Sequence, residues 1–405
     1  MKKIILMLGT FDSKGNEFDY LHQELNRRNV EIISMNTGIF EPVGTFPIQI
    51  QAQEVAAAGG IPLLELRSIG DRGLAMKTMC AGAALLVEKL QKEHAIHGII
   101  GMGGGGGTAI AAKAMQALPL GFPKVCITTL ASGDTREYVG TKDILLFPSI
   151  VDICGINRFT RMIISRAAGA VCGMVETDPP EERDDRPIIC LSMFGNSTAC
   201  VERCSKLLEQ NGYAPLVFHA TGTGGRSMED LILEKYCTAC LDITVTEWAD
   251  EICGGVLSAG TKRLDGPGIA GIPGCLDMVN FGSRETVPEY YKNNERLFYE
   301  WNPMATLMRT NKEENARLGK ILAEKANRSE APTAFVLPMR GLSVLDGQGQ
   351  VFCDWETDQV LFDAIEQHLN ANIPVIKVDA NINDAVFSEK AVAVLLKLIN
   401  EKESE

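Results

Sequence analysis

A run of five glycines after an apolar segment is the sharpest chemical signal in the sequence. The run lies in the string GMGGGGGT at residues 101–108, and a helix-like segment follows it. Glycines lack Cβ, so their backbone amides can turn toward a ligand, and a helix N-terminus adds partial positive charge. The loop therefore suits a phosphate, and a Cβ at Gly105 is expected to obstruct any positive-φ conformation there. The predicted phosphate-binding residues are Gly103, Gly104, Gly105, Gly106, Gly107 and Thr108.

The same glycine string also matches the dinucleotide fingerprint G-x-G-x-x-G. An NAD site of that kind needs an acidic residue about 20 positions on, at the end of the next strand. Here that strand ends in the string CITT at residues 126–129. NAD binding therefore stays a third interpretation, and a flexible turn with close helix packing is the structural alternative. The sequence has no GxxxxGK[ST] pattern, which excludes a P-loop of the usual kind.

A second polar turn follows the apolar segment at residues 215–218. It reads HATGTGGRS at residues 219–227, and its hydroxyls, glycines and arginine suit an anion. His219 beside it is a candidate for chemistry, although a lone histidine near a strand end is more often structural. The residues predicted to bind a ligand here are Thr221, Gly222, Thr223, Gly224, Gly225 and Arg226.

Further polar residues follow other predicted strands, where open α/β sheets bind ligands. The candidates are Asp12 and Lys14 in residues 9–14, Asp134 and Arg136 in residues 131–137, and Gly195, Asn196 and Ser197 in residues 194–198. The alternative for Asp12, Ser13 and Ser197 is to cap the helices that follow. Glu247 comes after the strand at 241–245 and is the candidate Mg²⁺ ligand, since nucleotide phosphates usually bring that ion.

Alternating strand-like and helix-like segments predict the elements that position these loops. The predicted strands are 3–8, 30–35, 97–102, 124–129, 144–147, 188–194, 215–218, 241–245, 333–337 and 375–378. The predicted helices are 16–28, 74–93, 108–118, 157–174, 198–211, 226–235, 312–327, 358–370 and 384–401, and residues 254–303 are less regular. This rhythm predicts an α/β fold with two doubly wound, Rossmann-like parallel sheets. Residues 176–187, rich in proline and charge, separate domains 1–178 and 187–405.

Composition limits the partners and the location of the 405-residue chain. Its net charge of −13 repels phosphate backbones and anionic membrane surfaces, which argues against nucleic acid and membrane partners. The apolar run at the start is too short for a signal peptide, and no apolar stretch approaches the ~20 residues that span a bilayer. The twelve cysteines are scattered, and the CxxC at Cys237 and Cys240 lacks partners for zinc, so we expect reduced thiols in a cytoplasmic protein.

Several long strings carry a resemblance to a known family. They are GTFDSKGNEFDYL, GMGGGGGTAIA, TTLASGDTREYVGTKDI, SMFGNSTACV, FHATGTGGRSMEDL, TVTEWADEICGGVLSAG and PGCLDMVNFG. They resemble the ATP-binding, amino-terminal domain of the tomato mosaic virus resistance protein and its uncharacterised bacterial and fungal relatives, over almost the whole chain. The resemblance implies two Rossmann-like subdomains, ATP binding and self-association into a homodimer. For the plant protein it also implies inhibition of viral RNA replication through a viral replication protein.

The sequence thus predicts an ATP-binding protein, and the first hypothesis for its role is an enzyme that acts on a small carboxylated or phosphorylated metabolite. Six residues are expected to converge between the domains: Asp12, Lys14, Asp134, Arg136, His219 and Glu247. The alternative is a nucleotide-gated module that contacts another protein without turnover, and the third interpretation is an NAD-dependent oxidoreductase. The expected partners are a nucleotide, a small-molecule ligand and a second copy of the chain.

Overall fold

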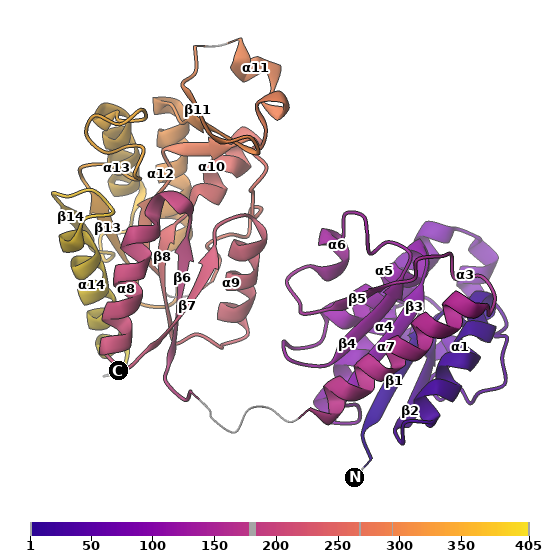
Figure 1. The fold of residues 1–405 in the computed structure, drawn as a ribbon. Coiled ribbons are helices and arrows are strands. Elements are labelled where there is room, and N and C mark those ends of the chain that lie inside the picture. Colours follow the sequence, from indigo (N-terminus) through magenta and orange to yellow (C-terminus); the bar gives the residue numbers. More distant parts are fainter. Residues whose placement is uncertain (1, 178–183, 267–268, 294, 404–405) are drawn as a thin grey trace. The chain divides into compact units, whose positions relative to one another are not determined.

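Two parallel β-sheets, one in each half of the chain, carry the fold (Figure 1). The computed structural model divides into unit 1, Met1–Glu181, and unit 2, Glu182–Glu405. It describes residues 2–177, 184–266, 269–293 and 295–403, so residues 178–183 of the predicted boundary lie outside the described part. Both units are α/β with helices on the two faces of a parallel sheet, which confirms the predicted fold class.

In unit 1, the five strands lie in the order β2-β1-β3-β4-β5, and each neighbouring pair is parallel. The strands are β1 (Ile4–Gly9), β2 (Glu31–Asn36), β3 (Gly98–Gly103), β4 (Lys124–Thr128) and β5 (Leu145–Pro148). The helices are α1 (Phe11–Asn26), α2 (Ala52–Ala58), α3 (Leu63–Ile69), α4 (Arg72–Lys92), α5 (Gly105–Gln116), α6 (Arg136–Val139) and α7 (Arg158–Glu176). The strand order reverses direction between β1 and β3, which is the place where doubly wound sheets bind ligands.

The apolar residues of β1 show why both faces of this sheet are covered. Ile5 and Met7 pack with α1 and α7, whereas Leu6 and Leu8 pack with α2, α4 and α5. Successive side chains of a strand point to opposite faces, so a strand that is buried on both sides is apolar throughout. As a result α1, which follows β1, and α5, which follows β3, lie on opposite faces of the sheet (Figure 1).

In unit 2, six parallel strands lie in the order β14-β13-β9-β8-β6-β7, and a separate antiparallel sheet has the order β10-β12-β11. The strands are β6 (Ile188–Met193), β7 (Ala214–His219), β8 (Ala239–Thr244), β9 (Ile269–Gly274), β10 (Met278–Asn280), β11 (Phe298–Asn302), β12 (Ala305–Arg309), β13 (Ala334–Pro338) and β14 (Val375–Val378). The helices are α8 (Thr198–Gln210), α9 (Thr223–Leu233), α10 (Thr246–Cys253), α11 (Glu289–Lys292), α12 (Lys312–Ala326), α13 (Trp355–His368) and α14 (Ala385–Glu403). Helices α8 and α14 cover one face of the larger sheet, and α9, α10, α12 and α13 cover the other.

Three helices begin earlier than the sequence predicts. Helices α1, α5 and α9 begin at residues 11, 105 and 223, whereas glycine and polar residues placed their predicted starts at 16, 108 and 226. Glycine is a poor helix former, so sequence rules exclude it from a helix. In the structure the glycine and polar residues before the predicted starts form the first turns of the helices. The loops between strand and helix are therefore shorter than predicted.

Two other expectations need correction. Residues 254–303, expected to be irregular, contain β9, β10 and β11, and β9 was missed because its sequence IAGIPG has the glycine and proline content of a loop. Cys190 and Cys237 form a disulfide, so the prediction of reduced thiols is wrong for both. No helix in the described part of the chain is long and apolar enough to cross a membrane.

Candidate functional site

A pocket of about 660 Å³ lies in unit 1 at the carboxyl ends of β1 and β3. We call it the switch-point pocket. Its wall comes from the segments after β1 and β2, from α3 and α4, and from the first turns of α5. The lining residues are Thr10, Asp12, Ser13, Lys14, Thr37, Gly38, Ile39, Phe40, Leu66, Arg67, Gly70, Asp71, Arg72, Ala75, Met76, Met79, Gly104, Gly105, Gly106, Gly107 and Ile110.

The N-terminus of α5 presents backbone amides to this pocket. Gly104 is the N-cap, no side chain caps the helix, and the first amide to bond back to Gly104 is that of Thr108. Residues 105–107 therefore carry amides without an intrahelical partner. None of the five glycines has a positive φ, so a Cβ at Gly105 has no such conformation to obstruct. A Cβ on Gly105 would meet nothing within 4 Å, whereas a Cβ on Gly103 would lie 2.6 Å from the Cα of Gly107.

The N-terminus of α1 lies beside that of α5. Its N-cap residue Thr10 makes no side-chain cap bond, and its hydroxyl lies 4.0 Å from the position of a Cβ on Gly107. Asp12 and Ser13 are in the first turn of the helix, so neither is the N-cap residue that the sequence alternative suggests. The Asp12 carboxylate instead accepts a 3.0 Å hydrogen bond from the amide of Phe40 and holds the segment after β2.

Three basic side chains line the switch-point pocket. Lys14, at a non-helical φ of −133° within α1, donates to the carbonyl of Ile153. Arg67 donates to the carbonyl of Ile39 and has only a long, exposed contact with a glutamate. Arg72 makes no hydrogen bond or ion pair with the described part of the chain. The lining also holds two carboxylates, Asp12 and Asp71, so its three cations leave a formal charge of +1, which gives the pocket a local preference for anions.

An apolar wall faces part of the same space. It consists of Ile39, Phe40, Leu66, Ala75, Met76, Met79 and Ile110. The Met76 sulfur lies 3.6 Å from the position of a Cβ on Gly106, so this wall adjoins the first turn of α5. Phe40 is 63% exposed. Thr37 is only 2% exposed, and its hydroxyl has no hydrogen-bond partner in the described structure. The pocket therefore combines an anion cradle, an apolar surface and one unpaired hydroxyl.

Two of the predicted unit 1 candidates lie elsewhere. Asp134 and Arg136 pair with each other at 2.6 Å on the surface, and neither lines the switch-point pocket. Hydrogen bonds from Arg136 lower the pKa of Asp134 to about 2. Thr108 is buried, and its hydroxyl lies 2.7 Å from that of Thr128, so it fixes α5 against β4 and does not line the pocket.

The glycine turn at residues 222–225 in unit 2 is occupied by the protein itself. The Glu247 carboxylate accepts hydrogen bonds from the amides of Gly222 at 2.7 Å and Gly225 at 3.1 Å, and its other oxygen pairs with Arg263 at 2.6 Å. Glu247 is 1% exposed, and a Cβ on Gly225 would lie 2.1 Å from its carboxylate. This geometry does not fit the predicted roles of Glu247 in binding Mg²⁺ and of the turn in binding an external anion.

The remaining unit 2 candidates have structural partners. His219 is exposed at the end of β7, with its ring 5.4 Å from that of Phe194 and nearly perpendicular to it. The Ser197 hydroxyl lies 2.6 Å from that of Thr244. Asn196 is buried, with its amide group against the sulfur of Met278, and Gly195 opens the same short 3₁₀ turn. Arg226 lies on the surface near the Thr223 hydroxyl. A catalytic role for His219 stays a prediction.

Two family models cover nearly the whole chain. Residues 3–180 match the N-terminal domain, and residues 186–399 the C-terminal domain, of the uncharacterised protein family UPF0261. The chain belongs to the UPF0261 family. A UPF0261 protein of Clostridium tetani is 46% identical over 406 residues, which span 99% of both chains. The ToMV resistance protein Tm-1(GCR237) of Solanum lycopersicum is 34% identical over 97% of this chain and 55% of its own length.

Two solved structures show a distant likeness to this UPF0261 chain. The UDP-GlcNAc 2-epimerase of Neisseria meningitidis is 9% identical with a TM-score of 0.24, over 98% of this chain and 100% of that one. MurG of Acinetobacter baumannii is 11% identical with a TM-score of 0.23 over the same shares. Structural similarity with TM-scores this low gives no information about a ligand of this chain.

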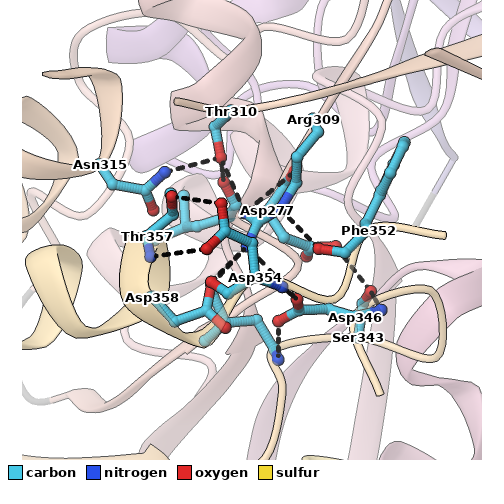
Figure 2. A network of polar contacts seen from close by, with 12 residues as sticks. Asp277, Arg309, Thr310, Asn315, Ser343, Asp346, Phe352, Asp354, Thr357 and Asp358 are labelled. Carbon is cyan, nitrogen blue, oxygen red and sulfur yellow. Dashed lines mark hydrogen bonds and ion pairs between the residues drawn. The ribbon is translucent and has the colours of Figure 1, made fainter. Parts of the chain in front are cut away.

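The UPF0261 C-terminal domain holds a buried polar network that sequence reasoning missed (Figure 2). Arg309, at the end of β12, pairs with Asp358 at 2.6 Å and Asp346 at 3.3 Å. Asp277 accepts a 2.7 Å hydrogen bond from Ser343, and its second oxygen has no partner among the described residues. The three carboxyl groups lie at separate places in the sequence, so no local sequence motif predicts the network. Their one shared signal is that Asp277 and Asp346 each follow a strand of the larger sheet.

Burial makes this network sensitive to pH. Burial, with a contribution from the charge of Asp346, raises the pKa of Asp277 to about 7. Burial also raises the pKa values of Asp346 and Asp358, although Arg309 opposes this. Three buried carboxyl groups share one guanidinium, so the folded protein keeps protons that the unfolded chain releases.

We predict that Asp277→Asn makes the stability of this UPF0261 protein less dependent on pH. Because the folded state binds the extra proton, the contribution of Asp277 to the wild-type free energy of unfolding falls as pH rises from the ordinary aspartate value of 3.8 to about 7. Each such proton contributes about 1.4 kcal/mol per pH unit. Urea unfolding at several pH values should show a shallower fall for the variant. The exposed Asp363→Asn on α13 is the control, and an equal slope in Asp277→Asn and wild type would contradict the prediction.

Proposed function

We propose that unit 1 binds a nucleotide, ATP in the first instance, with its phosphates at the N-termini of α1 and α5. The observation that carries this proposal is the pairing, in one pocket, of two helix N-termini whose N-cap residues make no side-chain cap bond, beside Lys14, Arg67 and Arg72. Free amides at helix N-termini bind phosphate oxygens, and the helix dipole favours negative charge there. These local effects act despite the net charge of −13.

The rest of the pocket suits the other parts of a nucleotide. Its volume of about 660 Å³ lies in the usual range of small-molecule sites, about 300–1,000 Å³. Phe40 and Met76 supply apolar surface for a base, and the unpaired Thr37 hydroxyl supplies a polar contact. Mg²⁺ usually reaches such sites with the phosphates and binds one or two carboxylates. Asp12, a lining carboxylate, replaces Glu247 as the proposed contact for it.

A bound nucleotide can serve either catalysis or regulated contact with another protein. An enzyme that acts on a carboxylated or phosphorylated metabolite stays a prediction, as does a homodimer. The alternative is a module whose contacts with another protein depend on the nucleotide, and the relative named ToMV resistance protein is its precedent. Steady ATP hydrolysis would exclude that alternative. The NAD interpretation has no further support, since β4 ends at Thr128, whose hydroxyl is bonded to Thr108.

We predict that Gly105→Val weakens ATP binding at least about tenfold, or about 1.4 kcal/mol, without unfolding the protein. A Cβ at this position meets open space, so valine adds bulk next to the phosphate cradle without a clash in the fold. Isothermal titration with Mg-ATP under reducing conditions measures the affinity, and circular dichroism measures the fold.

The matched control for this variant is Gly103→Ala. Its Cβ would lie 2.6 Å from the Cα of Gly107, so it should destabilise unit 1 by itself. If Gly105→Val folds and binds ATP with wild-type affinity, the phosphates do not bind at the N-terminus of α5. If the wild-type protein binds no Mg-ATP, the proposal as a whole is overturned.

We predict that Arg72→Gln lowers the affinity for ATP more than that for adenosine, because the guanidinium acts on phosphates. Arg72 has no partner in the described structure, so the free energy of unfolding should change by less than about 0.5 kcal/mol. ATP affinity should fall about fivefold at low salt, and by less at high salt. Lys77→Gln, an exposed position on α4 outside the lining, is the control. An equal loss of ATP affinity in Arg72→Gln and Lys77→Gln would contradict a direct contact between Arg72 and phosphate. So would an equal loss of affinity for ATP and for adenosine in Arg72→Gln.

A further inference from the structure

A second pocket, of about 570 Å³, lies in unit 1 at the carboxyl ends of β4 and β5. We call it the β4–β5 pocket. Its lining residues are Thr128, Thr129, Ala131, Ser132, Pro148, Ser149, Ile150, Val151 and Asp152. None of them is among the residues that line the switch-point pocket, so the two pockets have separate walls. Because the strands of the sheet are parallel, both pockets open at the same edge.

The two pockets are neighbours at one point. The Thr129 hydroxyl lies 3.8 Å from the position of a Cβ on Gly104, and Gly104 lines the switch-point pocket. The buried hydroxyls of Thr108 and Thr128, 2.7 Å apart, join the first turn of α5 to the end of β4 directly below. A molecule in the β4–β5 pocket would therefore be adjacent to an anion held at the N-terminus of α5.

The chemistry of the lining differs between the pockets. Three cations line the switch-point pocket, whereas Asp152 is the one charged side chain among the residues that line the β4–β5 pocket. Thr129 and Ser132 supply hydroxyl groups that have no bond within the described structure. This lining offers hydrogen bonds and a negative charge, so it favours a neutral or cationic polar molecule over an anion.

The loop after β5 is held in an unfavourable backbone conformation. Ile150 has a φ of 63°, although it is β-branched and 77% exposed. The amide of Val151 bonds to the carbonyl of Ser149 at 2.7 Å, and the Ser149 hydroxyl bonds to the carbonyl of Val151 at 2.6 Å. No burial of Ile150 compensates for this conformation. Such strain at an exposed position is typical of ligand-binding loops.

The same loop is tied to the first helix of the switch-point pocket. The Lys14 ammonium group donates to the carbonyl of Ile153, and the amide of Gly155 donates to the buried Glu17 carboxylate at 2.5 Å. Both contacts join α1 to residues that directly follow Asp152. The positions of the two pocket walls are therefore linked through these bonds.

We infer that the β4–β5 pocket binds a second small molecule, one with hydroxyl groups and no negative charge, beside the phosphates of the nucleotide. A neutral polyol or an amino alcohol fits this lining, with Asp152 as the contact for an ammonium group. The inference rests on the proposed function only for the identity of the neighbouring anion. It also changes the expected class of the second ligand, since the lining does not favour a carboxylated or phosphorylated metabolite.

The test uses three ligands of similar size and different charge: glycerol, serinol (2-amino-1,3-propanediol) and glycerate. Saturation-transfer NMR titrations of the full chain, with Mg-ATP present, give their relative affinities. We expect serinol to bind about fivefold more tightly than glycerate, with glycerol between them. Asp152→Asn should remove the preference for serinol. Glu137→Gln, an exposed acid of the same region outside the lining, should keep it.

A second variant tests occupancy of the pocket itself. Ala131→Trp should abolish binding of all three ligands while nucleotide affinity stays within about twofold of wild type. Ligand binding that is the same in wild type, Asp152→Asn and Ala131→Trp would overturn the inference. So would loss of serinol binding on saturation with Mg-ATP, because the pocket would then belong to the nucleotide. One outcome separates the two proposals: the protein binds no nucleotide but binds serinol, glycerol and glycerate in the predicted order of affinity, with the predicted effects of Asp152→Asn and Ala131→Trp. In that case the proposed function is wrong and the inference about the β4–β5 pocket holds.

Discussion

The reversal of strand order between β1 and β3 is the constraint on which the candidate site depends. Helices α1 and α5 leave adjacent strands for opposite faces of the sheet, so their N-termini stay close together at its edge. Neither N-cap residue makes a side-chain cap bond. The amide of Phe11 donates to the Asn36 side chain at 3.2 Å, so the amides left without a partner in the described structure are those of Asp12 in α1 and of residues 105–107 in α5. Ligand or water must satisfy them. The basic residues and the apolar wall around this edge then define what kind of ligand is favoured.

Two glycine turns that look alike in the sequence differ in how their amides are satisfied. At residues 104–107 no side chain of the described structure caps the helix, whereas at residues 222–225 the Glu247 carboxylate takes that place. Glu247 is in turn neutralised by Arg263, which also pairs with Asp242 and Glu229 in the interior of unit 2. The second turn is thus part of a buried ionic network, where removal of one partner leaves uncompensated charge.

The sequence predicted most strands of the two sheets because central strands such as β1, β3 and β4 are apolar runs that are buried on both faces. It also predicted that Asp12, Lys14 and residues 104–107 contribute to a ligand site, and the structure places these residues in one pocket. It could not reveal Arg67, Arg72 or Phe40, which reach this pocket from segments without a recognisable motif. It could not distinguish the two glycine turns either, since Glu247 lies 22 and 25 residues from the amides that it binds. The glycine run also suggested a loop before a helix that begins at residue 108, but residues 104–107 form the N-cap and first turn of that helix.

Backbone amide NMR shifts with Mg-ATP and with adenosine test the placement of the phosphates directly. We predict that Mg-ATP shifts the amide resonances of residues 105–107 and of Asp12, and that adenosine leaves those of residues 105–107 nearly unchanged. Shifts of that pattern would place phosphates at the two helix N-termini. Binding of Mg-ATP with these amides unaffected, or with the main shifts at residues 222–225, would contradict a phosphate site at α1 and α5.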